Sequence, residues 1–158
     1  MKYTVITGAS SGIGYEAALA FASRGKNLVL VARRQEELNE LKLKINEMHP
    51  ELDVVIRRTD LSVTEDVYKL YESLQSFQIE TWINNAGFGN FASIAEQNLN
   101  KIETMLHVNI EALTILSSLL FSFEIIQRLT EHSLLTFHRA ADTRLLLMLL
   151  RIALRNSM

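Results

Sequence analysis

The sequence contains no cysteine and only one proline, Pro50, in 158 residues. Without cysteine there is no disulfide framework and no thiolate metal site, and a reducing compartment is permitted. Charge of one sign is not in excess, because 16 Lys and Arg stand against 18 Asp and Glu, for a net charge of -2. This balance excludes the basic footprint of a nucleic-acid-binding domain, so we expect no nucleic-acid partner.

Long hydrophobic runs are also missing. The longest late apolar run, Leu145 to Leu150, is far too short to cross a bilayer. The first residues, Met1 to Thr7, lead straight into a strand pattern and leave no room for a signal peptide. We therefore expect no membrane association and a cytoplasmic location. The length and a hydrophobic content of 48% fit one domain with a real core.

Apolar runs and amphipathic stretches alternate along the first 120 residues. Short β-branched runs predict strands at residues 3–6, 27–32, 52–56 and 81–85. Helical spacing of apolar residues predicts helices at 13–23, 35–48, 63–77 and 99–120. Strands that alternate with helices favour an α/β fold with right-handed crossovers and a parallel sheet.

A glycine-rich loop follows the first predicted strand and opens the first predicted helix, with the sequence Thr-Gly-Ala-Ser-Ser-Gly-Ile-Gly. Gly8 permits a tight turn, Gly12 lets the backbone approach a pyrophosphate, and Gly14 allows close packing of helix and strand. The start of a helix offers free N–H groups and a positive dipole end to an anion. In this context the loop predicts a nucleotide site rather than an ordinary turn.

The spacing of these glycines resembles that of the short-chain dehydrogenase/reductase family, and other motifs follow in the family's order. Asp60-Leu61 after the third strand resembles the family's adenine-contacting Asp, and Asn84 to Gly87 resembles its Asn-Asn-Ala-Gly motif. Asn109 in the long helix matches an active-site Asn of the family. The resemblance covers residues 4 to 120.

The resemblance implies a Rossmann-type, doubly wound parallel sheet with strand order 3-2-1-4 and an NAD(P)-dependent oxidoreductase acting on a carbonyl or alcohol. Residues 1–120 would form the incomplete NAD(P)-binding domain. Asn109 would be the only catalytic residue present. The implied cofactor-binding residues are Gly8, Ser10, Ser11, Gly12, Ile13, Gly14, Arg33, Arg34, Asp60, Leu61, Asn85, Ala86 and Gly87.

Two arginines, Arg33 and Arg34, follow the second predicted strand directly. An acidic residue there would bond the adenosine 2'-hydroxyl, whereas a guanidinium suits a 2'-phosphate through bidentate contacts. Because neither residue is acidic, we expect NADP(H) rather than NAD(H). The alternative is that both arginines are solvated loop charges.

The family's remaining catalytic residues are absent from the sequence. The family uses a Ser and a Tyr-x-x-x-Lys pair after the Asn, but the last Tyr here is Tyr71 and the last Lys is Lys101. Composition also changes at about residue 121: every Gly, Lys and Val lies before it, and half of the arginines lie after it. We therefore expect residues 121–158 to be a tail of uncertain structure and the chain to lack turnover.

A shifted reading frame offers an explanation for the tail. In this frame each codon takes the last base of one codon and the first two bases of the next. Across Leu134 to Arg139 such codons can encode Ile-Asn-Ile-Ser-Ser, and across Arg151 to Asn156 they can encode Tyr-x-x-x-Lys. Both runs resemble the family's catalytic segments. Our hypothesis is that Phe121 to Met158, within a few residues, is a frameshifted translation of a complete enzyme gene.

The tail as written predicts an apolar helix over Leu134 to Leu154 and no fifth strand, which would leave Thr81 to Asn85 at the edge of the sheet. The long helix 99–120 is where the family commonly packs against a second subunit, so a homo-oligomer is expected there. His132 and His138 are too far apart for a helical metal pair, and we expect no metal site.

Two other functions stay open at this point. One is a catalytically dead nucleotide-binding or interaction protein, which would bind cofactor without turnover. The other is a different Rossmann-type enzyme, such as a methyltransferase, in which Asp60 and the Asn-Asn-Ala-Gly motif would have no reason to occur. The substrate is not indicated by the sequence.

Overall fold

The computed structural model describes residues 1–90, 93, 96–127 and 133–136. In this part of the chain a parallel sheet of five strands has the order β3-β2-β1-β4-β5. The predicted order 3-2-1-4 of a Rossmann-type sheet is thereby confirmed. The strands are β1 (Lys2–Thr7), β2 (Asn27–Ala32), β3 (Val54–Arg58), β4 (Gln78–Asn84) and β5 (Ser133–Thr136).

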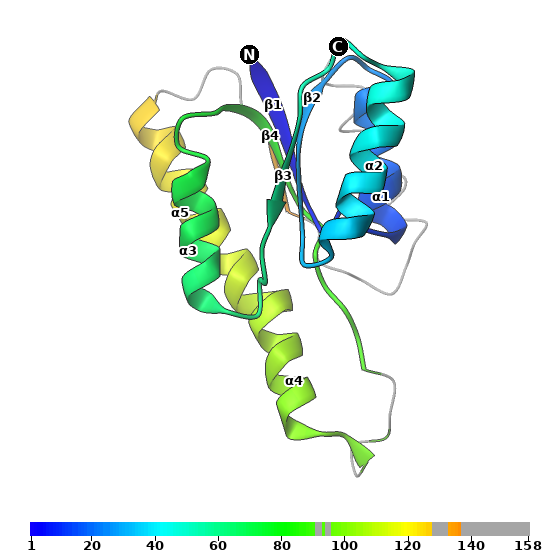
Figure 1. Ribbon diagram of the computed structural model, residues 1–158. Helices are drawn as coiled ribbons and strands as arrows, with labels where there is room; N and C mark the ends of the chain where they lie inside the picture. The colour runs from blue at the N-terminus through cyan, green and yellow to red at the C-terminus, as the bar shows by residue number, and fades with distance from the viewer. Residues whose placement is uncertain (91–92, 94–95, 128–132, 137–158) are drawn as a thin grey trace.

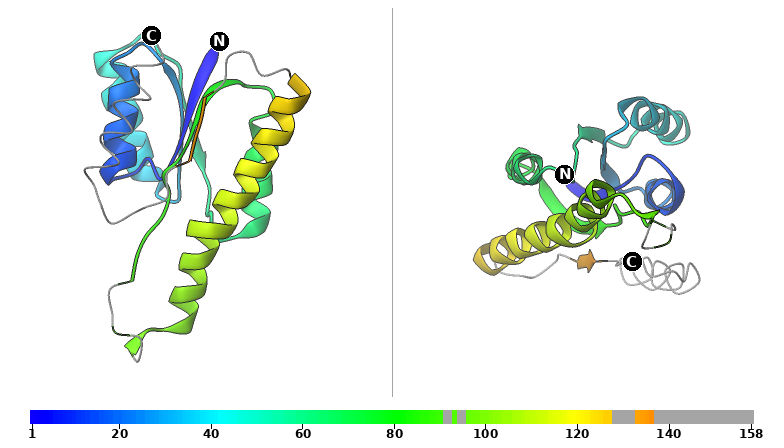
Figure 2. Two further views of the ribbon diagram at one scale, coloured as in Figure 1. Left: turned by 180° about the vertical axis from the view of Figure 1, so that it is seen from behind. Right: turned by 90° about the horizontal axis from the view of Figure 1, so that it is seen from below.

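Helices cover both faces of the sheet (Figure 1). One face carries α1 (Gly12–Ala22) and α2 (Gln35–Met48). The other carries α3 (Thr64–Ser73) and a long helix composed of α4 (Leu99–Leu106), η2 (His107–Ala112) and α5 (Leu113–Gln127). The view from behind in Figure 2 shows the same two layers with the sheet between them.

A separate apolar core fills the space between the sheet and each helix layer. Under α1 and α2, the largest buried side chains include Phe21, Leu41 and Ile45. Under α3 and α5, Trp82 and Leu116 are 1% exposed. The central strands are buried on both faces, which is why they read as unbroken apolar runs rather than as alternating ones.

The prediction that a fifth strand is missing is wrong. Ser133–Thr136 pairs in parallel with β4, with Thr81 opposite Ser133 and Asn84 opposite Thr136. The free hydrogen-bonding edge of β4 takes up this short segment although its composition does not predict a strand, because β-propensity depends strongly on context. Thr81 to Asn84 is therefore an inner segment of the sheet, and β5 lies beside it (Figure 2).

The helix predicted over Leu134 to Leu154 is wrong at its start, since Leu134 and Leu135 belong to β5. Its remainder, from residue 137 on, lies outside the described residues. The long helix also runs past the composition change at residue 121 and ends at Gln127. The boundary that we predicted at residue 120 thus falls inside one continuous helix.

The long helix contains a π-helical segment, η2, inside the helix predicted over 99–120; the apolar spacing did not predict this change of helix type. Other boundaries differ by a few residues. The third predicted helix ends at Ser73 rather than Phe77, and β4 begins three residues early at Gln78. Apolar side chains that pack beyond the helix end, including Leu74 at 2% exposure, extend the periodic pattern further than the helix itself.

Within the described residues, no helix has the length and apolar character needed to cross a membrane.

Candidate functional site

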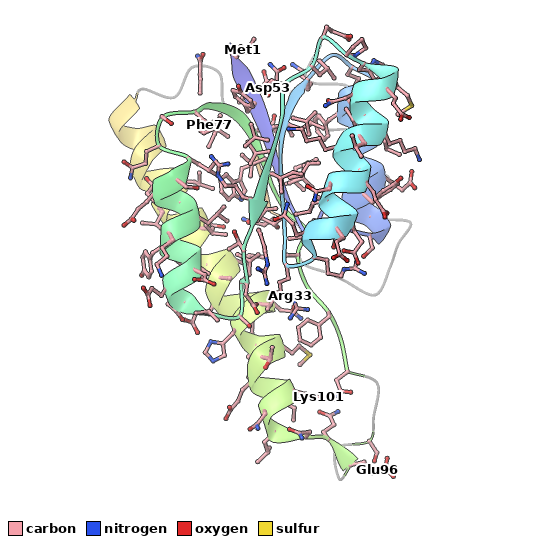
Figure 3. The ribbon with its side chains drawn as sticks, viewed as in Figure 1. Met1, Arg33, Asp53, Phe77, Glu96 and Lys101 are labelled. Atoms are coloured by element: carbon pink, nitrogen blue, oxygen red, sulfur yellow. The ribbon has the colours of Figure 1, made fainter. Side chains whose placement is uncertain are left out.

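A cleft of about 390 Å³ opens at the carboxyl ends of the strands, between the two helix layers. This is the end of a parallel sheet where ligands bind in doubly wound folds. Arg33 lies at this end, opposite the end that carries Met1 (Figure 3). The cleft is lined by Gly8, Ser10, Ser11, Gly12, Ile13, Ala32, Arg33, Arg34, Thr59, Asp60, Leu61, Asn85, Ala86, Gly87, Phe88 and Val108. The cofactor-binding residues predicted from the sequence thus lie together on it, except Gly14.

Gly14 lies behind the cleft, where the first turn of α1 meets the end of β1. A Cβ at this position would stand 2.3 Å from the carbonyl oxygen of Gly8 and 2.5 Å from the side-chain nitrogen of Asn85. Gly14 therefore allows the close contact of helix and strand that the sequence predicted for it.

Gly8 and Gly12 have backbone conformations that favour glycine, with φ of +69° and +57°. At Gly12 a Cβ would meet no atom within 4 Å, so the space beside this residue is open. The loop thus turns tightly at Gly8 and presents its backbone at Gly12 to the cleft. This geometry fits a pyrophosphate that approaches the backbone at the start of α1.

The start of α1 differs from the starts of the next two helices. Its first turn holds no acidic residue, and the side chain of Ser11 at the N-cap makes no capping hydrogen bond. In contrast, α2 has Glu36 and Glu37 in its first turn, and α3 has Glu65 and Asp66. Acidic side chains satisfy the positive end of a helix. Of these three helices, only α1 has an N-terminal end without an acidic side chain, and this end can therefore receive an anion from outside the chain.

Thr7 and Asn85 join the ends of β1 and β4 below the glycine loop. The Thr7 hydroxyl accepts hydrogen bonds from the backbone N–H groups of Asn85 and Ala86, both at 3.0 Å. The Asn85 side chain donates to the carbonyl oxygen of Thr7 at 3.0 Å. These bonds fix the floor of the cleft. The sequence did not single out Thr7, whose position just before Gly8 was the available signal.

Arg34 reaches from the start of α2 back to the glycine loop. Its Nη2 donates to the Ser10 hydroxyl at 3.1 Å, and its Nη1 lies 3.1 Å from the carboxylate of Glu37. The side chain is half exposed, at 52%. A guanidinium is thus held at the mouth of the cleft, in contact with the loop that the sequence predicts to bind phosphate.

Asp60 follows β3 and lines the same cleft. Its Oδ1 accepts hydrogen bonds from the Ser62 backbone N–H at 3.0 Å and from the Ser62 hydroxyl at 2.7 Å. Burial alone would raise the pKa of the Asp60 carboxyl. The two bonds from Ser62 and the positive charge of Arg33 outweigh burial, so the pKa lies below its ordinary value. Asp60 is therefore an anionic hydrogen-bond acceptor at neutral pH.

Asn109 lies in η2 and holds the loop after β4. Its Oδ1 accepts from the backbone N–H of Phe88 at 3.1 Å, and its Nδ2 donates to the Phe88 carbonyl at 2.8 Å. Phe88 itself lines the cleft. The structure therefore places Asn109 next to the cleft, with its side chain occupied by the backbone of that loop.

Ala32, Thr59, Phe88 and Val108 also line the cleft, and the sequence did not predict them. Each directly precedes or follows a predicted site residue in the chain, which is the only sequence signal they carry. Among the described residues, no cluster of three or more His, Cys, Asp and Glu side chains is arranged to hold a metal ion.

A family model described as short chain dehydrogenase matches residues 2–127. An "uncharacterized oxidoreductase" of Mycobacterium tuberculosis is 34% identical over 110 residues, which make up 68% of this chain and 44% of the relative. The chain thus spans less than half the length of this relative. The alternative of a methyltransferase is wrong, because the short chain dehydrogenase model matches the stretch that contains Asp60 and the Asn-Asn-Ala-Gly motif.

Solved structures show the same fold. A short-chain dehydrogenase from Sphingobium yanoikuyae in complex with NADPH has a TM-score of 0.79 and 30% identity, and the match covers 86% of this chain and 53% of that one. A bulky-bulky ketone specific alcohol dehydrogenase from Comamonas testosteroni has a TM-score of 0.76 and 31% identity, with coverage of 80% and 51%.

Proposed function

Because the chain belongs to the short-chain dehydrogenase family, we propose that its cleft binds a nicotinamide dinucleotide for hydride transfer to or from a carbonyl or alcohol group. The observation that carries this proposal is the acid-free start of α1, which faces a cleft together with Asp60 and Arg34. The open space at Gly12 accommodates a phosphate there. Titration of the protein with NADPH, followed by the change in nicotinamide fluorescence, tests the proposal.

The cofactor that we propose is NADP(H) in preference to NAD(H). Arg33 and Arg34 both line the cleft at the end of β2, and Arg34 contacts the glycine loop through Ser10. A guanidinium in this place would make charge-assisted, bidentate contacts with a 2'-phosphate and only a weaker hydrogen bond with a 2'-hydroxyl. NADPH should therefore bind about tenfold more tightly than NADH, which corresponds to one charge-assisted contact. Equal affinities for the two would contradict the preference.

Each part of the cleft has its own task in this proposal. The first turn of α1 would hold the pyrophosphate, and Arg33 and Arg34 the 2'-phosphate. The anionic Asp60 would accept a hydrogen bond from the adenine amino group. Asn109 fixes the loop at Phe88, and so fixes one wall of the cleft. The bound cofactor would supply or accept the hydride.

We propose further that a chain of these 158 residues binds the cofactor without turnover. Residues 110–158 contain neither Tyr nor Lys, so the family's acid-base residue and the cation that supports it are absent from the sequence after Asn109. Asn109 is the one family active-site residue that is present. The absence of these residues favours a catalytically dead nucleotide-binding protein for this sequence. Oxidation of NADPH by carbonyl compounds at ordinary enzyme rates would overturn the proposal.

The origin of the tail is a separate proposal, namely that Phe121 to Met158, within a few residues, is a frameshifted translation of a complete enzyme gene. The observations that motivate it are the composition change at about residue 121 and the catalytic motifs that the shifted frame can encode. The family match ends nearby, at residue 127. The coding DNA across codons 110–158 decides the matter. A one-base change that restores Ser and Tyr-x-x-x-Lys in register would support the proposal, and a shifted frame without Tyr-x-x-x-Lys would end it.

We propose a homo-oligomer through the long helix. No residue of α4 is buried, and Figure 1 shows α4 extending beyond the sheet. Apolar side chains are exposed along this stretch at Leu99 (73%), Leu106 (44%) and Ile110 (52%). Burial of these side chains in a second copy would stabilise a dimer. Sedimentation of the Leu106→Glu variant should show a monomer where the unaltered protein sediments as a dimer.

A further inference from the structure

The π-helical segment η2 carries a second polar contact besides that of Asn109. Two residues further along, Glu111 accepts a hydrogen bond from the Thr64 hydroxyl to its Oε1 at 2.5 Å. Its other oxygen, Oε2, lies 2.9 Å from Nδ1 of His107. Glu111 does not line the cleft, and no sequence motif pointed to it.

Thr64 is the first residue of α3 and ends the loop that follows β3. This loop is held closed by its own hydrogen bonds. The Thr59 N–H donates to the Ala32 carbonyl at 3.0 Å, and the Val63 N–H donates to the Asp60 carbonyl at 3.1 Å. Leu61, which lines the cleft, lies inside the turn closed by the Val63–Asp60 bond, three residues before Thr64.

On the opposite side of the contact, η2 contributes Val108 to the cleft wall. Leu61 and Val108 are each 8% exposed and belong to the same apolar cluster. They approach the cleft from two elements that are far apart in the sequence. The Glu111–Thr64 hydrogen bond joins these two elements directly, 47 residues apart.

We propose that Glu111 is a positioning residue for nucleotide binding, which holds the apolar wall formed by Leu61 and Val108 at the width that receives the adenine base. With Asn109 holding Phe88, η2 then fixes two loops of the cleft at once. This inference rests on the proposed function, because it assigns the wall to a nucleotide base.

A purely stabilising role fits the exposure of these side chains less well. The side chains of His107 and Glu111 are 44% and 40% exposed, and ion pairs at such exposure contribute little to the free energy of unfolding. The value of the contact lies in placing the loop after β3. Loss of Glu111 should therefore change local motion and nucleotide affinity more than it changes the melting temperature.

The test compares Glu111→Ala, Glu111→Gln and the control Glu103→Ala, which removes an exposed carboxylate from α4. Gln keeps an oxygen that can accept from Thr64. Adenosine 2',5'-bisphosphate is titrated by calorimetry, and hydrogen exchange is measured in the ligand-free protein over residues 60–66. Glu111→Ala should weaken binding about fivefold, as expected for one lost hydrogen bond, and speed exchange over 60–66.

Glu111→Gln and Glu103→Ala should both stay within about twofold of the unaltered protein, since neither removes the acceptor for Thr64. The inference is overturned if Glu111→Ala leaves exchange over 60–66 unchanged, or binds the bisphosphate as the unaltered protein does. If the unaltered protein binds neither the bisphosphate nor NADPH nor NADH, the proposed function fails and the inference fails with it. Failure of the proposed function can be told from failure of the inference alone, because in the latter case the unaltered protein still binds the nucleotide.

Discussion

The polar groups at the two ends of the sheet find their partners in different ways. At the amino end, near the labelled Met1, Asp53 and Phe77 in Figure 3, side chains pair with one another. The Tyr3 hydroxyl donates to Asp53 at 2.6 Å, and the Tyr3 ring meets that of Phe77 edge-on at a centroid distance of 4.9 Å. At the carboxyl end, backbone N–H groups and charged side chains surround an open cleft.

The difference shows how one sheet divides stability and binding between its ends. Polar groups at the amino end are satisfied within the chain, as Lys26 and Glu80 are at 3.1 Å. Groups at the carboxyl end include the start of α1, which neither a carboxylate nor a side-chain cap satisfies. Changes at the carboxyl end should therefore reduce nucleotide binding, whereas changes at the amino end should reduce only stability.

The largest effect is expected for Gly14→Ala. The new Cβ would stand 2.3 Å from the Gly8 carbonyl oxygen, and because this atom belongs to the backbone, helix and strand must separate. We expect a loss of about 3 kcal/mol in the free energy of unfolding and no measurable NADPH binding. Urea denaturation and fluorescence titration measure the two effects.

Gly25→Ala is the matched control for that change. Gly25 has a positive φ, +72°, which Gly14 does not, and a Cβ there would meet no atom within 4 Å. Only the backbone strain remains, at about 1 kcal/mol, and NADPH binding should persist. If both variants lost the same stability and the same affinity, the close contact at Gly14 would not be what holds the glycine loop.

A smaller effect, confined to one cofactor, is expected for Arg34→Ala. Removal of the guanidinium beside Ser10 should weaken NADPH binding about tenfold and leave NADH binding unchanged, because only NADPH carries the 2'-phosphate. The ratio of the two dissociation constants is the measurement. Lys69→Ala, which removes a positive charge from α3, is the control and should not alter the ratio.

Much of the fold could be predicted because the periodicity of the sequence is local. The predicted strand Asn27–Ala32 and helix Gln35–Met48 match the structure at both ends. The predicted cofactor loop likewise depends on glycines that are close together in the chain. A short apolar run before glycines, and a helix after them, are sufficient to indicate such a loop.

The remainder depends on contacts between residues distant in the sequence. Thr7 receives bonds from Asn85 and Ala86, 78 and 79 residues away, and nothing near Thr7 indicates this. Strand β5 forms because β4 offers a pairing edge, which composition alone does not show. The π-helical segment that places Asn109 against Phe88 leaves no trace in the apolar spacing either.

The pH dependence of stability should show the contribution of Asp60. Its pKa is lower in the folded chain than its ordinary value of 3.8, so the carboxylate stabilises the fold above that value. This contribution is lost as the pH falls below about 4 and through the folded pKa. Asp60→Asn should reduce the free energy of unfolding by about 1 kcal/mol at pH 7 and flatten its decline between neutral and acidic pH.

Ser62→Ala tests the same contact from the other side. It keeps the Asp60 carboxylate and removes the hydroxyl that donates to its Oδ1 at 2.7 Å. The decline of the free energy of unfolding towards acidic pH should become less steep, but not as flat as in Asp60→Asn, because the Ser62 backbone N–H still donates to Oδ1. A profile that Asp60→Asn does not flatten would show that the Ser62 hydrogen bonds do not favour the ionised form.

The smallest effect is expected at the amino end, for Tyr3→Phe. The ring contact with Phe77 remains, and only the hydroxyl that bonds Asp53 is removed. Because Asp53 is still reached by water, the free energy of unfolding should fall by only about 0.5–1 kcal/mol. NADPH affinity should stay the same, because neither Tyr3 nor Asp53 lines the cleft. An affinity loss in Tyr3→Phe would mean that the two ends of the sheet are coupled through β1, and that binding is not a property of the carboxyl end alone.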